Sequence, residues 1–163
     1  DIALRTEVAE AEVLLHQLEQ GALDAVLVHR PSYYAGLNVE QLLEEKLVLV
    51  RSPINPEPFL FINWGSDFVG RYDAALPQPR HAALTFNFGP LALQYLLRAG
   101  GSGYFRTRVV EPYLDSGALE KVAGAPEFTH PVFLVYRNGA SDALDAALAG
   151  FRALSVADTE WNL

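Results

Sequence analysis

Apolar residues follow two different spacings along the chain, and together they predict an α/β fold. Largely apolar runs, typical of strands, occur at Leu23–Val28, Leu47–Val50 and Val132–Tyr136, and the continuous Leu/Val run at 47–50 is typical of a strand buried on both faces. Stretches with apolar residues three and four positions apart, typical of amphipathic helices, lie between such runs. The predicted strands are residues 2–5, 23–28, 47–50, 59–63, 82–86, 102–105, 119–122 and 128–136. The predicted helices are residues 6–20, 66–76, 90–99, 107–114 and 141–154.

The order of these elements predicts two lobes. A strand, a helix and a strand within the first 28 residues indicate a right-handed crossover onto a parallel sheet. Pro53, Pro56 and Pro58 then form a connector. After a second alternating series, the last strand and helix return to the first lobe. We therefore expect one lobe from residues 1–55 and 134–163 and another from 58–130, with crossings near 53–58 and 126–133.

Composition narrows the class of protein. Half of the 163 residues are apolar and 20% are charged, which is a globular composition and excludes wholesale disorder. The net charge of −8 argues against direct contact with nucleic acid. No apolar run approaches the roughly 18 residues of a membrane helix, and no signal peptide is visible. Because the chain begins with Asp1, we expect a fragment or a processed product.

Candidate catalytic and metal-binding groups are sparse. The chain has no cysteine, and none of its four histidines has a second histidine two to four positions away. No G-x-S-x-G nucleophile motif is present. The sequence therefore predicts no catalytic residue, no metal and no cofactor. The glycine cluster at Gly100–Gly103 leaves two alternatives open, a helix stop with a tight turn or backbone brought close to a ligand.

Turns from strand to helix give a better candidate site. Thr6, Ser66 and Asn87 each follow a predicted strand and precede a predicted helix. Ligands of parallel sheets bind beyond the carboxyl ends of the strands, where helix N-termini offer free N–H groups to anions. Helix capping alone also explains each of the three residues. Two facing lobes would place Thr6 on one wall of a cleft and Ser66 with Asn87 on the other.

Five further side chains complete the predicted site. Arg30 follows the second strand and would add a positive charge suited to a carboxylate, although a surface ion pair is an equal alternative. Trp64, Phe68 and Phe88 would supply apolar walls. Tyr104, after the glycine cluster, could stack on a ligand or donate a hydrogen bond. The effector is expected to be anionic if Arg30 faces the cleft, and neutral if it does not.

Several segments, in order along nearly the whole chain, resemble LysR-type transcriptional regulators. Each motif is weak alone, and together they are fairly specific. Glu19–Val28 resembles the family pattern L-x-x-G-x-L-D-x-A-L. Leu42–Val50 resembles L-x-E-x-L-V-L-V, and Phe59–Phe68 resembles a subgroup pattern Y-x-x-V-D-W-G-x-x-F. Leu96–Gly103 resembles L-V-x-x-G-x-G, and Val110–Leu119 resembles V-x-P-x-L-x-x-G-x-L.

The resemblance implies the effector-binding domain of such a regulator. Its implied fold is periplasmic-binding-protein-like, with two Rossmann-like lobes joined by two crossover segments and a small effector between them. The winged helix-turn-helix would precede Asp1, so DNA is contacted only through that missing domain. A homodimer or tetramer, a cytoplasmic location and no membrane are also implied.

One departure limits the transfer of ligand chemistry from the family. Where the family pattern has G-x-G-I-x-x-L-P, this chain has Gly101–Arg106, and the usual proline is missing. Two alternatives to a regulator remain at this point. A transport-type periplasmic solute-binding protein fragment would share the fold, and an enzyme would need a catalytic constellation that the sequence lacks.

Overall fold

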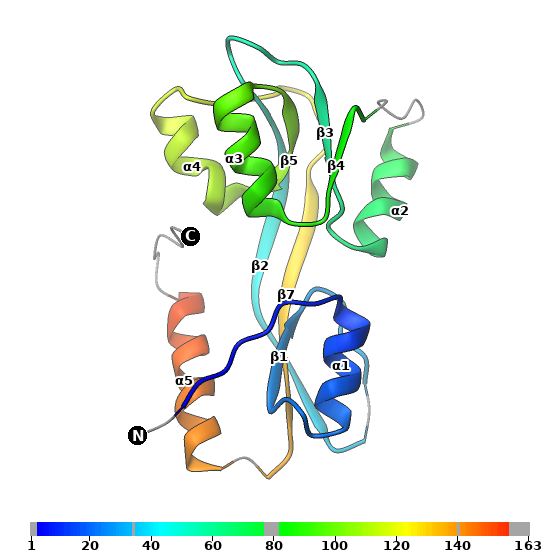
Figure 1. The fold of residues 1–163 in the computed structure, drawn as a ribbon, viewed down its shortest axis with the longest axis vertical. Coiled ribbons are helices and arrows are strands. Elements are labelled where there is room, and N and C mark those ends of the chain that lie inside the picture. The colour runs from blue at the N-terminus through cyan, green and yellow to red at the C-terminus, as the bar shows by residue number, and fades with distance from the viewer. Residues whose placement is uncertain (1–2, 34, 77–81, 140, 157–163) are drawn as a thin grey trace. The chain divides into compact units, whose positions relative to one another are not determined.

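The computed structural model describes residues 3–33, 35–76, 82–139 and 141–156 (Figure 1). Helices and strands alternate over most of this part, as the sequence predicts. The helices are α1 (Ala11–Glu19), α2 (Ser66–Ala75), α3 (Gly89–Ala99), α4 (Thr107–Asp115) and α5 (Asp142–Val156). The strands are β1 (Ala25–Val28), β2 (Leu37–Arg51), β3 (Phe59–Ile62), β4 (Leu84–Phe86), β5 (Ser102–Arg106), β6 (Glu120–Lys121) and β7 (Phe128–Arg137).

The chain divides into two compact units. Of the described residues, 3–44 and 131–156 form unit 1, and 45–130 form unit 2. Two neighbouring strands, β2 and β7, each contribute to both units. The first crossing therefore lies within β2, whereas the proline-rich connector predicted at 53–58 lies inside unit 2. The physical reason is that residues 37–51 contain neither proline nor glycine, so the strand continues unbroken for 15 residues.

The sheet of unit 2 contains both parallel and antiparallel strand pairs. Strand β3 pairs in parallel with both β4 and β5. Strand β2 runs antiparallel to β5, with Val48 opposite Phe105 and Leu49 opposite Tyr104. Short β6 adds to the end of β2. Because β3, β4 and β5 are mutually parallel, their carboxyl ends lie at one edge of the sheet.

Each face of the unit 2 sheet is buried by its own helices (Figure 1). On one face, Val48 and Val50 pack with residues of α3 and α4, including Leu96 and Val110. On the other face, alternate residues of β2 join an aromatic cluster that includes Phe68 and Tyr72 of α2. The continuous Leu/Val run at 47–50 thus has the cause predicted for it, burial on both sides.

Unit 1 contains the antiparallel pair β1–β7, with Val26 opposite Val135. Helix α1 packs on one face through Leu15 and Leu18, which join Val26, Val28 and Val135 in a small core. Figure 1 shows α5 on the opposite side of these strands from α1. As predicted from its sequence, Ser141 caps α5, because its Oγ accepts the N–H of Leu144 at 3.3 Å.

The start of the chain departs from the prediction. Residues 3–10 form neither strand nor helix, and α1 begins at Ala11 with Glu10 as its N-cap. Thr6 is therefore not a helix cap, and the predicted parallel crossover is wrong because β1 pairs with β7 in antiparallel fashion. A short apolar segment forms a strand only where a sheet edge pairs with it, and described residues 3–5 pair with no strand.

The glycine cluster has a structural explanation. Gly100 ends α3 with a φ of 85°, and a Cβ on it would lie 2.6 Å from the backbone oxygen of Asn55. The N–H of Gly101 donates to the same oxygen at 2.7 Å. The close approach is thus to the 52–58 segment of this chain. Of the two alternatives, the structure supports the helix stop with a tight turn.

Helix α5 is tied to the sheet of unit 1 by a forked ion pair. Arg152 Nε and Nη2 each lie 2.7 Å from one carboxylate oxygen of Glu40. The guanidinium also lies over the ring of Tyr136, 5.8 Å from its centroid. The hydrogen bonds from Arg152 hold the pKa of Glu40 below its ordinary value of 4.5.

We expect Glu40→Gln to lower the urea midpoint of unfolding at pH 7. A carboxyl whose pKa is lowered by folding contributes stability above its unfolded-state pKa and loses it as the pH falls through the folded value. The difference between variant and parent should therefore disappear when unfolding is repeated near pH 3. Glu44→Gln, at an exposed position of the same strand, is the matched control. An equal deficit at both pH values would contradict the ion-pair explanation.

Candidate functional site

Three helices of unit 2 begin at the carboxyl edge of its parallel strands. Residues 63–65 connect β3 to α2, residues 87–88 connect β4 to α3, and β5 runs directly into α4. The N-cap residues Gly65, Phe88 and Arg106 provide no side-chain cap. The first-turn N–H groups of three helices are thus left for water or a ligand at one edge, an arrangement suited to a polar or anionic group.

Ser66 and Asn87 do not cap these helices, which corrects that part of the prediction. The N-caps fall one residue away, at Gly65 and Phe88. Gly65 adopts a φ of 101°, and its N–H donates to Asn63 Oδ1 at 3.0 Å. A residue with a Cβ disfavours that φ, so the turn requires glycine at the cap position. Ser66 is instead the first helical residue and is exposed.

Trp64 connects all three strand ends. Its Nε1 donates to the backbone oxygen of Tyr104 in β5 at 2.9 Å. Its ring packs against Gly89 at the start of α3, where a Cβ would come within 2.5 Å of the indole. The ring also meets the imidazole of His130 edge-on, with 5.6 Å between centroids. The half-buried indole is therefore fixed in position, as a wall of a binding site must be.

Phe68 and Tyr104 do not line an open surface, contrary to the predicted roles of wall and stacking group. Each is 2% exposed. Their ring centroids lie 6.0 Å apart, and both contact Phe128. Both rings lie on the face of the sheet that α2 covers, in the same buried cluster as Leu47 and Leu49. Phe88, by contrast, is 50% exposed at the start of α3.

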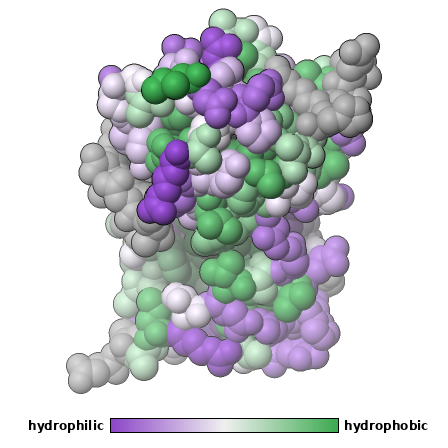
Figure 2. Space-filling view, turned by 45° about the horizontal axis from the view of Figure 1, so that its top comes forward, coloured by the Kyte–Doolittle hydropathy of each residue, from purple (hydrophilic) through white to green (hydrophobic). Residues whose placement is uncertain are grey.

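Among the predicted residues, the structure brings together Trp64, Ser66, Asn87 and Phe88 at the strand edge of unit 2. Thr6 and Arg30 belong to unit 1 and are exposed there. Figure 2 shows hydrophobic residues (green) reaching the upper surface among hydrophilic ones (purple). In unit 2 the exposed large apolar residues include Phe88 and Leu91, three positions apart on the first turn of α3.

Sequence reasoning missed two buried polar residues at this edge. Glu45 and His130 are buried, at 8% and 2% exposure. The Glu45 carboxylate lies 3.5 Å from Nη1 of Arg106, at the end of β5. The signal that could have found Glu45 is its spacing. It stands two residues before Leu47, so a longer predicted strand would have placed it on the same buried face.

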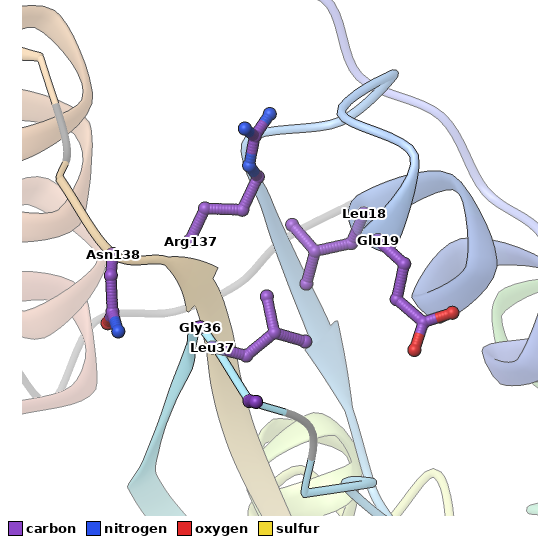
Figure 3. Close-up of a pocket in the computed structure, with 7 residues that line it drawn as sticks. Leu18, Glu19, Gly36, Leu37, Arg137 and Asn138 are labelled. Atoms are coloured by element: carbon purple, nitrogen blue, oxygen red, sulfur yellow. The ribbon is translucent and has the colours of Figure 1, made fainter.

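Unit 1 has a separate surface hollow of about 550 Å³. Leu18 and Leu37 form its apolar part, and Figure 3 shows Arg137 and Glu19 at its rim with their charged ends pointing away from each other. The Arg137 guanidinium lies against Gly21, where it occupies the space of a side chain. None of the predicted site residues lines this hollow. Its charged groups do not converge, so the strand edge of unit 2 is the better candidate.

Comparison with known proteins assigns the family. Residues 1–156 match the family model described as the LysR substrate binding domain. The chain belongs to this family. No curated protein sequence matches the chain significantly. The resemblance recognised in the sequence motifs is thereby confirmed.

Solved structures show the same fold at low sequence identity. The apo regulatory domain of HypT from Salmonella typhimurium is 14% identical, with a TM-score of 0.77 over 91% of this chain and 80% of that one. Full-length LysG from Corynebacterium glutamicum with bound effector Arg is 12% identical, with a TM-score of 0.75 over 92% of this chain. ArgP from Mycobacterium tuberculosis is 15% identical, with a TM-score of 0.72 over 96% of this chain.

The predicted periplasmic-binding-protein-like α/β fold is confirmed by these matches. The LysR-family chain spans 57% of the length of LysG and 59% of ArgP. In the described residues, no group of three or more His, Asp or Glu side chains could hold a metal ion. No helix within the same residues has the length and apolarity needed to cross a membrane.

Replacing Gly89 with alanine tests the position of Trp64. The added methyl group would overlap the indole, so we expect Gly89→Ala to displace the ring and break its hydrogen bond to Tyr104. The NMR resonance of the Trp64 indole N–H should shift and exchange faster with solvent. Gly70→Ala, in α2 with open space around the new methyl group, is the matched control. An unchanged indole resonance in Gly89→Ala would refute the contact.

Phe68 and Phe88 should contribute very differently to stability, because Phe68 is buried and Phe88 is half exposed. We expect Phe68→Ala to lower the free energy of unfolding by about 3–5 kcal/mol, because it removes a buried ring from a packed cluster. Phe88→Ala should cost about 0.5 kcal/mol or less, because its ring is already half exposed. Urea unfolding followed by circular dichroism measures both. Similar costs for the two variants would contradict this division.

Proposed function

We propose that this LysR-family domain binds a small-molecule effector and thereby regulates transcription by the protein that carries it. The observation that carries the proposal is the strand edge of unit 2. There, three uncapped helix N-termini lie beside the fixed ring of Trp64 and the exposed ring of Phe88. Convergent polar groups next to apolar walls are typical of small-molecule sites.

Binding, not catalysis, is the proposed activity. The chain contains no cysteine and no G-x-S-x-G motif. Membership of the LysR substrate binding domain family also favours binding over catalysis. The site therefore acts through the ligand's different affinities for alternative states of the regulator, because a ligand shifts an equilibrium only by that difference.

Three further parts of the proposal rest on family membership. DNA is contacted by a winged helix-turn-helix outside this chain, in keeping with the net charge of −8 here. The regulator acts as a homodimer or tetramer in the cytoplasm. The transport-type solute-binding alternative shares the fold, but the family match favours the regulator.

The site prediction also remains part of the proposal. Trp64, Ser66, Asn87 and Phe88 are its unit 2 members. Thr6 and Arg30 are exposed on unit 1 and remain predictions for that unit, with Arg30 as a positive charge suited to an anionic effector. LysG provides a precedent within the fold, since that protein has been solved with bound effector Arg.

A thermal-shift screen of metabolites tests the proposal. A ligand that binds only the folded state at 100 times its Kd stabilises it by about 2.7 kcal/mol, which raises the melting temperature by several degrees. For a ligand found in this way, we expect Phe88→Ala to weaken binding at least fivefold in calorimetry. Tyr33→Ala, an exposed aromatic in unit 1, is the control and should leave Kd unchanged. If Phe88→Ala and Tyr33→Ala bound the ligand with equal affinity, the ligand site would not be the strand edge of unit 2.

A further inference from the structure

Arg106 occupies a junction in unit 2. It is the last residue of β5 and the N-cap of α4. Its partner across the sheet is Leu47, so its side chain lies on the same face as the aromatic cluster. The side chain is 34% exposed, so part of the guanidinium reaches solvent where the parallel strands end.

The inner end of Arg106 meets a buried carboxylate. Nη1 lies 3.5 Å from Glu45 Oε2, within reach of an ion pair but too far for a well-formed hydrogen bond. Arg106 Nε and Glu45 Oε2 are both buried, and neither has a hydrogen-bond partner among the described residues. A buried pair with unmet hydrogen bonds stabilises a fold weakly. Structural stabilisation is therefore a poor explanation for this pair.

The outer end of Arg106 has the chemistry of an anion receptor. A guanidinium presents a planar fork of donors that matches a carboxylate. The first-turn N–H groups of α4 follow it directly, without a side-chain cap. Trp64 is hydrogen-bonded to the backbone of Tyr104, two residues earlier, and supplies an apolar surface nearby.

We propose that Arg106 binds an anionic group, of the carboxylate class, on the ligand of unit 2, and that Glu45 is the internal counter-ion with which this group competes. The inference rests on the proposed function, because it assumes that unit 2 binds a small molecule. It names the chemical class of that ligand and the residue that selects it.

Coulomb's law fixes how Glu45 affects the binding of an anion to Arg106. Glu45 partly neutralises Arg106, so its charge opposes binding of an anion. Removal of the Glu45 charge should strengthen that binding while leaving neutral ligands unaffected. Glu45 is also the first residue of unit 2 on β2. Occupancy of Arg106 therefore changes the charge balance at the point where this strand enters the unit.

Matched pairs of acids and amides test the selection. Butyrate and butyramide, benzoate and benzamide, and phenylacetate and phenylacetamide differ in charge but hardly in shape. With the 163-residue chain in calorimetry, we expect at least one acid to bind ten times more tightly than its amide. Arg106→Gln should abolish this preference, and Arg106→Lys should retain part of it. Arg108→Gln, the same change at an exposed position two residues later, is the control and should keep it.

Glu45→Gln tests the competition. We expect it to raise affinity for the acid about tenfold and to leave affinity for the amide unchanged. The effect should vanish in the double variant Glu45→Gln/Arg106→Gln. That double variant leaves no unpaired buried charge, so it also replaces Arg106→Gln if the single variant fails to fold.

The outcomes separate this inference from the function on which it rests. An acid that binds the parent and Arg106→Gln equally well would overturn the inference and leave the function standing. Preference for amides, or weaker acid binding in Glu45→Gln, would also overturn it. If neither these pairs nor the wider metabolite screen yields a ligand, the proposed function fails, and the inference fails with it.

Discussion

Burial of β2 on both faces is the constraint on which unit 2 depends. Leu47 and Leu49 face the aromatic cluster, while Val48 and Val50 face the helices α3 and α4. Apolar side chains on successive positions exclude water from both sides of one strand, so helices must cover both faces. The pairing of β2 with β5 then fixes which side chains of β5 point to each layer. Tyr104 and Arg106 lie on the aromatic side for this reason.

The candidate site is a consequence of that layered arrangement. Helices that cover a parallel sheet must begin at the carboxyl edge of its strands, so their N-termini converge there. A large aromatic side chain at this edge needs a fixed polar end to remain ordered, and the Trp64 hydrogen bond to Tyr104 provides it. Gly89 leaves the room that the ring requires. At this edge the Trp64 ring is thus held in place, while the N–H groups of the helix N-termini have no side-chain cap.

A buried Glu45 so close to a partly exposed Arg106 is unfavourable for a site whose task is structural. Apolar residues of similar size would pack as well without the desolvation of two charges. A sensor has a different requirement, since it must respond to charge on a ligand while remaining folded without one. The solved structures that share this fold are only 12–15% identical to the chain, so individual side chains of the site are free to differ.

Local pattern by itself determined most of the elements of this protein. The runs at 47–50 and 128–136, the proline in the first turn of α3, the glycine stop at 100 and the cap at Ser141 follow from rules that act over a few residues. The motifs likewise indicated the family, because each is a short pattern within one segment of the chain. Tertiary structure decided what depends on distant partners. Residues 3–5 lacked a sheet edge to pair with, Phe68 and Tyr104 were buried by the layer that α2 forms, and Glu45 met Arg106 only through the β2–β5 register. Such contacts join residues that lie far apart in the chain, and no local spacing encodes them.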